Sequence, residues 1–114
     1  MSEYRIPEFE IIDQLASVRG GGKRYAYAAT TIRTETGRVI RAEVVRDYYR
    51  DQSRAVAQLL TDNGWVALLT EPAERWHEAT NIETRTETDV WELFDPIINE
   101  LLTRAGMLLA LPTE

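Results

Sequence analysis

The first half of the chain alternates between apolar and polar residues in a way that predicts a β-hairpin. Ile40, Ala42 and Val44 take every second position, which is typical of a strand with one face turned to the core. A further strand is expected over residues 25–34. The polar turn TETG between them ends in Gly37, a residue that can adopt positive φ.

The next segment has helical spacing. Ser53 is a suitable N-cap, Val56, Leu59 and Leu60 form one apolar stripe, and Gly64 is a suitable left-handed residue after the last turn. The sequence predicts a helix of about ten residues here. The run WVALLTEP that follows is short, apolar and stopped by proline, which predicts a buried strand.

A second segment follows the same rules. Asp95 is the expected cap, Pro96 takes the first helical position, and Gly106 ends the helix. The apolar stripe consists of Ile97, Ile98, Leu101 and Leu102. The run MLLAL at 107–111 then predicts a second buried strand, which ends before Pro112.

The two segments are also similar in their letters. Residues 58–69 read QLLTDNGWVALL and residues 100–111 read ELLTRAGMLLAL, so that five of twelve positions are identical. An internal duplication explains this, and so does the shared preference of helix-to-strand turns for leucine and glycine. Both explanations predict the same order, in which a helix, a turn and a strand occur twice.

These elements predict an α+β fold, with a largely antiparallel sheet and two amphipathic helices on one face. Residues 39–72 and 73–111 would be paired strand-helix-strand units, the order of a split βαβ, ferredoxin-like domain. Residues 1–22 would add an N-terminal extension with a glycine-rich loop, within one domain over 1–114. Residues 8–18 fit either a helix or a strand.

Charge is divided unevenly along the chain, whose net charge is −6. Residues 1–60 carry ten Lys and Arg against eight Asp and Glu, whereas residues 61–114 carry three against eleven. This asymmetry favours a partner with a basic surface or head-to-tail self-association, and makes nucleic acid an unexpected partner. No apolar run is long enough for a membrane helix, the N-terminal residues do not resemble a signal peptide, and no cysteine is present. We therefore expect a cytoplasmic protein.

No set of catalytic or metal-binding residues can be assigned. His77 is the only histidine, and although Glu74 and Glu78 are close in sequence, one imidazole is a poor metal site and an incomplete triad. The RGGGKR stretch could offer amide groups to a phosphate, but it lacks the Ser or Thr that a Walker loop places after lysine. The sequence therefore predicts no cofactor, no metal and no catalytic residue.

The favoured function is a non-catalytic protein-binding module of the inhibitor, immunity or adaptor type. Rigid aromatic residues rimmed by carboxylates are typical of interface hot spots. The candidate partner-binding residues are Trp76, Glu78, Glu83, Trp91 and Glu92. The terminal apolar strand would lie at a sheet edge and needs cover, which predicts a homodimer through Leu108, Leu109 and Leu111.

Two other functions remain open. A small ligand or substrate would use a pocket near Trp76 and His77. Single-stranded nucleic acid would use the first hairpin, where aromatic and cationic side chains share one face in an alternating strand. The residues of that face are Tyr25, Tyr27, Thr31, Arg33 and Arg41.

Overall fold

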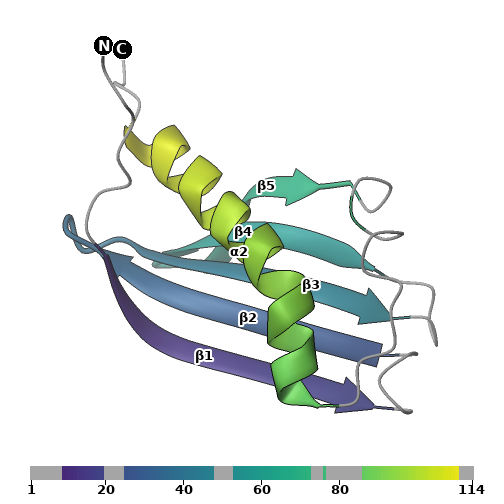
Figure 1. The fold of residues 1–114 in the computed structure, drawn as a ribbon. Helices are drawn as coiled ribbons and strands as arrows, with labels where there is room; N and C mark the ends of the chain where they lie inside the picture. The colour runs from purple at the N-terminus through teal and green to yellow at the C-terminus, as the bar shows by residue number, and fades with distance from the viewer. Residues whose placement is uncertain (1–8, 20–24, 48–52, 73–75, 77–85, 111–114) are drawn as a thin grey trace, which may run out of the picture.

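The computed structural model of the chain describes residues 9–19, 25–47, 53–72, 76 and 86–110. Within these residues, five strands follow one another as an antiparallel meander, and one long helix crosses one face of the sheet (Figure 1). The elements are β1 (Phe9–Arg19), β2 (Tyr25–Thr34), β3 (Val39–Asp47), β4 (Arg54–Thr61), β5 (Gly64–Glu71) and α2 (Glu87–Ala110). Each strand pairs with its neighbour in sequence, so that β1 and β5 are the edges.

The predicted hairpin between residues 25–34 and 39–47 is confirmed. Thr34 and Arg38 close the turn, because the Thr34 amide donates to the Arg38 carbonyl at 2.8 Å and the Arg38 amide donates to Thr34 Oγ1 at 3.1 Å. Gly37 has φ +84°, the left-handed conformation that glycine adopts without a steric penalty. The turn pairs Ile32 with Ile40, so that both lie on the face under α2.

The core lies between α2 and a sheet face rich in alanine. Five alanines at this face have no solvent exposure: Ala26, Ala28, Ala42, Ala55 and Ala57. Small side chains let the helix approach the sheet closely, and larger residues from the helix fill the space. The helix contributes Val90, Phe94, Ile98, Leu101, Leu102 and Ala105.

The start of α2 is fixed by reciprocal hydrogen bonds. The Asp89 amide donates to Thr86 Oγ1 and the Thr86 amide donates to Asp89 Oδ2, both at 3.2 Å. This capping box satisfies two amides that the first turn would leave without a partner. The helix continues through Pro96, which is exposed and has no N–H to donate to the carbonyl of Glu92.

The predicted fold class is wrong. The described residues form a five-stranded antiparallel meander with one helix, and neither the two helices on one face nor the ferredoxin-like order is present in them. The predicted unit at 39–72 contains three strands, and most of the unit at 73–111 is one helix. For residues 8–18, the strand alternative is confirmed by β1.

The segment predicted as the first helix is strand β4. Ala55 and Ala57 face α2, whereas Val56 and Leu60 point to the opposite side. The helical spacing of Val56, Leu59 and Leu60 is coincidental, because of these three only Leu59 packs against the core, on the same face as the two alanines. Gly64 has positive φ, +107°, but it is the first residue of β5, directly after the hairpin turn, and ends no helix.

The second helix is longer than predicted, because it begins before Asp95 and continues past Gly106. Asp95 and Pro96 lie within α2, which the Thr86 cap starts two turns earlier. Gly106 also lies inside the helix, and residues 107–110 of the predicted terminal strand are helical. The two similar stretches therefore fold differently, one as a hairpin and the other as helix, and do not mark a repeated structural unit.

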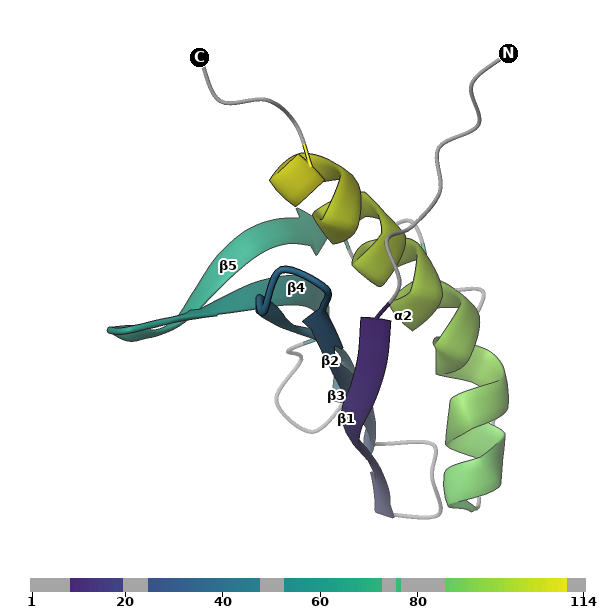
Figure 2. The ribbon, with the colours of Figure 1, turned by 90° about the vertical axis from the view of Figure 1, so that its left-hand side faces the viewer.

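Figure 2 shows the sheet from its edge, with α2 on one side and the tip of the β4–β5 hairpin pointing away from it. The face opposite α2, which we call the open face, carries polar and aromatic residues from the inner strands. No helix among the described residues is long and apolar enough to span a membrane.

Candidate functional site

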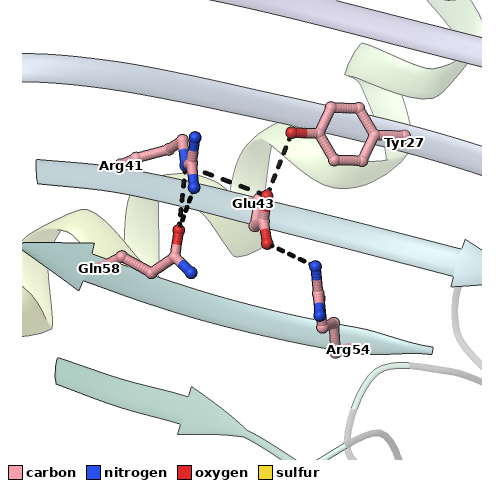
Figure 3. A network of polar contacts seen from close by, with 5 residues as sticks. All are labelled: Tyr27, Arg41, Glu43, Arg54 and Gln58. Atoms are coloured by element: carbon pink, nitrogen blue, oxygen red, sulfur yellow. Dashed lines mark hydrogen bonds and ion pairs between the residues drawn. The ribbon is translucent and has the colours of Figure 1, made fainter. Parts of the chain in front are cut away.

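The open face gathers a polar cluster from three strands (Figure 3). Strand alternation places these side chains there, because each is next in sequence to a residue that faces α2. The cluster consists of Tyr27 from β2, Arg41 and Glu43 from β3, and Arg54 and Gln58 from β4. It brings together residues that are far apart in the sequence.

Glu43 is the centre of the cluster, and its side chain is only 5% exposed. The Tyr27 hydroxyl donates to Oε2 at 3.1 Å, and Arg54 Nη2 donates to Oε1 at 3.0 Å. Arg41 Nε lies 4.0 Å from Oε2. Both carboxylate oxygens therefore have partners, which offset the cost of burying the charge.

Arg41 is held on two sides. Its Nε and Nη2 donate to Gln58 Oε1 at 3.0 Å and 2.7 Å. Its guanidinium carbon lies 4.2 Å from the centroid of the Trp65 ring, where the ring face attracts a cation. The planar guanidinium thus links the central strand β3 to both β4 and β5.

Tyr27 is perturbed by its position in the cluster. Burial of the phenol raises its pKa, and the charge of Glu43 and the hydrogen bond to it raise it further, to about 12. The hydroxyl therefore keeps its proton at neutral pH and donates it to the carboxylate. This hydrogen bond links β2 to β3 on the open face.

The sequence prediction for the face of the first hairpin is partly confirmed. Tyr27 and Arg41 are on the open face, and Arg41 lies opposite Thr31 in the register. Sequence reasoning missed Glu43, which places a carboxylate among the aromatic and cationic groups. The alternation of β3 put Glu43 on this face, but its contacts with Arg54 depend on a strand that the sequence did not predict.

The structure separates the predicted partner-binding residues. Trp76 is 4% exposed and packs edge-to-face on Phe94, with ring centroids 6.2 Å apart, so it belongs to the core. Trp91 is partly buried against the core and Glu92 is exposed, both on α2. Glu78 and Glu83 lie outside the described residues, as do His77 and the three glycines at 20–22.

The predicted oligomer residues are also divided. Leu108 is 46% exposed, whereas Leu109 is partly buried and packs against the core. Both belong to the last turns of α2 and not to an edge strand, and Leu111 lies outside the described residues. The edge that motivated the predicted homodimer is therefore absent from this part of the chain.

The exposed side of α2 is acidic. Five of its residues are acidic: Glu87, Asp89, Glu92, Asp95 and Glu100. Its only basic residue, Arg104, donates to the carboxylate of Glu71 on β5. Glu92 and Glu100 form no ion pair with any described residue, and Asp95 accepts only a hydrogen bond from Asn99. The outward face of α2 therefore carries negative charge that no basic residue in the described part of the chain compensates.

An apolar cavity of about 200 Å³ lies below the C-terminal part of α2. Its walls include Phe9, Ile32, Leu102 and Leu109, with Arg38 and the residues of the β2–β3 turn at the rim. Trp76, near which the ligand pocket was predicted, does not line this cavity. No group of acidic or histidine side chains among the described residues is arranged to hold a metal ion.

Comparison of the chain with protein-family models, with curated proteins and with solved structures finds no match.

Proposed function

We propose that the chain is a non-catalytic protein-binding module that presents the outer face of α2 to a basic surface on another protein. The observation that supports this function is that Glu92 and Glu100 have no ion-pair partner among the described residues, on a helix whose only basic residue is engaged by Glu71. Opposite charge on a partner would accelerate association and select against acidic surfaces.

Trp91 gives this face an apolar contact. It lies one position before Glu92, and its side chain is only partly covered by the core. A rigid indole that is already held on one side loses little conformational entropy when a partner covers the remainder. The expected interface therefore has the carboxylates of Glu92 and Glu100 at its centre and Trp91 at one margin, where the outer face of α2 meets the core.

Single-stranded nucleic acid is less well supported by the open face. Arg41 is engaged by Gln58 and Trp65, and the buried carboxylate of Glu43 would repel a phosphate placed nearby. The open face therefore supports binding of nucleic acid less well than the outer face of α2 supports binding of a protein.

Affinity capture with matched charge variants tests the proposal. The Glu92→Gln/Glu100→Gln double variant and a Glu35→Gln/Asp62→Asn control lose the same amount of negative charge, and all four positions are exposed. Proteins captured from the source cells by the wild-type chain should be lost with the helix variant, retained with the control, and released by raising the salt concentration. Equal capture by both variants would contradict the role of α2.

A second variant tests the aromatic contact. Trp91→Phe keeps an aromatic ring against the core but shortens its exposed part, so the affinity for a captured partner should fall while the unfolding transition changes little. Isothermal titration and thermal unfolding measure the two quantities. An unchanged affinity would exclude Trp91 from the interface.

A further inference from the structure

The outer edge of β1 has no partner strand in the described part of the chain. β1 has 11 residues and pairs there only with β2, so its other edge presents amide and carbonyl groups with no partner strand. Natural edge strands are usually short or interrupted by lysine or proline, which discourages further pairing. The sequence of β1, FEIIDQLASVR, contains neither lysine nor proline.

The two edges of the sheet differ in the apolar surface they expose. In β1, Ile11 is 52% exposed and Leu15 is 46% exposed, and Phe9 and Ile12 are also exposed. In β5, which has eight residues, Val66 is the one large apolar side chain among the exposed ones. Exposed apolar side chains next to unpaired backbone groups are typical of a strand that adds to another sheet. Of the two edges, β1 is therefore the better candidate.

The register with β2 assigns each β1 residue to a face. Ala16 and Val18 pair with Ala28 and Ala26, which face α2, and Ile11 pairs with Ile32 on the same face. Asp13, Leu15 and Ser17, which alternate with Gln14, Ala16 and Val18, lie on the open face. The register shift between Ile11 and Asp13 leaves Ile12 as an extra residue with no partner in β2. Ile11 therefore lies on the face under α2, and Asp13 on the open face.

We propose that two copies of this chain pair through β1, antiparallel about a two-fold axis at Leu15, and join two five-stranded sheets into one continuous sheet. In this register Leu15 lies opposite its own copy and Asp13 lies opposite Ser17. Beyond the bulge, Ile11 lies opposite Val18. Gln14 lies opposite Ala16. The large apolar residues Leu15, Ile11 and Val18 thus meet apolar residues, and no carboxylate lies opposite a carboxylate.

The neighbouring registers are less favourable. An axis at Asp13 places two carboxylates opposite each other, and an axis at Gln14 places Asp13 opposite Leu15. An axis at Ala16 places Leu15 opposite Ser17. Of these four axes, the one at Leu15 is the one that places an apolar residue opposite Leu15.

Single cysteines test the register directly, because the natural chain contains no cysteine. Residues opposite each other in an antiparallel pair have Cα atoms about 4.5–5.5 Å apart, within the range of a disulfide. Leu15→Cys should therefore form a disulfide-linked dimer on mild oxidation. In Asp13→Cys or Ser17→Cys alone, the two cysteines would be roughly 13 Å apart along the strand and should not react.

The two control cysteines gain a partner when the proteins are mixed. An equimolar mixture of Asp13→Cys and Ser17→Cys should give a mixed disulfide, which mass spectrometry identifies. If Leu15→Cys stays monomeric under oxidation, or if Asp13→Cys and Ser17→Cys link to themselves as fast as Leu15→Cys, the proposed pairing is overturned.

Sedimentation velocity tests the interface without cysteines. Leu15 and Leu108 are both 46% exposed, so lysine at either position adds the same charge at equal exposure. The wild-type chain and Leu108→Lys should sediment as dimers, and Leu15→Lys as a folded monomer by circular dichroism. A monomeric wild-type chain, or a dimer broken by Leu108→Lys and not by Leu15→Lys, would refute β1 as the interface.

Discussion

At the scale of single residues, one carboxylate organises the open face. Glu43 has one hydrogen bond from a neutral phenol and one from a guanidinium, and is nearly inaccessible to water. Loss of either donor would leave part of the buried charge without a partner. The free-energy cost of removing the carboxylate from water would then no longer be offset. The cluster therefore restrains the relative positions of β2, β3 and β4.

The shifted pKa of Tyr27 predicts a loss of stability in alkaline solution. Between pH 10 and about 12 the unfolded chain loses the phenol proton while the folded chain keeps it, so the free energy of unfolding falls as pH rises through this window. Two pKa units correspond to about 2.7 kcal/mol, but solvent screening of a partly exposed group reduces the expected change to roughly 1 kcal/mol.

Denaturation at about pH 9 and about pH 11 measures this change in the wild-type chain and in Tyr27→Phe. The variant lacks the ionisable group, so it should lose less stability than the wild-type chain over the same interval. Equal losses in the two proteins would show that Tyr27 does not retain its proton in the folded state.

At the scale of elements, Gly64 and Gly106 should respond in opposite ways to substitution by alanine, although the sequence predicted that each ends a helix. Gly64 has φ +107° with no atom within 4 Å of an added Cβ, so Gly64→Ala is penalised by the backbone alone, at about 1–2 kcal/mol. Gly106 is inside α2 and lines the cavity, so Gly106→Ala should stabilise by about 0.5–1 kcal/mol.

Chemical denaturation of both variants measures the two free energies of unfolding. The result for Gly106 also discriminates between the structure and the sequence prediction. A left-handed glycine at a helix end would make Gly106→Ala destabilising, whereas a glycine within a helix makes it stabilising. A destabilised Gly106→Ala variant would contradict an uninterrupted α2.

The elements that sequence could predict are those whose local signals agree. In the hairpin of residues 25–47, the period of two, the β-rich composition and Gly37 all favour the same structure. In β4 they disagree, because alanines form the core face while the larger Val56 and Leu60 point away from it. Asp95 and Pro96 are good helix-start residues, but a helix already formed from Thr86 continues through them.

The candidate site was predictable only where it lies on one element. Glu92 and Trp91 are adjacent on α2, and the sequence placed both on an acidic surface. Trp76 was expected on the same surface, but its contact with Phe94 buries it, and the sequence did not show that pairing. The Glu43 cluster needs three strands in register, which no local pattern specifies.

At the scale of the whole molecule, α2 and the sheet share one core, so damage to one should unfold both. Phe94 has no solvent exposure, contacts Trp76, and lies 5.8 Å from the guanidinium carbon of Arg46 on β3. Phe94→Ala should reduce the free energy of unfolding by about 3–5 kcal/mol.

Two probes of this variant test the shared core. The helical circular dichroism signal and the hydrogen-exchange protection of β2 and β3 amides should be lost at the same denaturant concentration. Val66→Ala, at a side chain that is 49% exposed, should change the free energy by less than about 0.5 kcal/mol. Loss of the helical signal before the exchange protection would show that the sheet is stable without α2.

The order of the elements also has a consequence for folding during synthesis. Each strand pairs with the one made just before it, so the meander can form by short-range steps as the chain emerges. The helix that covers it comes only after all five strands. The alanine-rich face therefore stays uncovered until α2 has been made, and during that interval the nascent sheet can aggregate or bind chaperones. Docking of α2, rather than strand pairing, is then the step that commits the chain to its folded state.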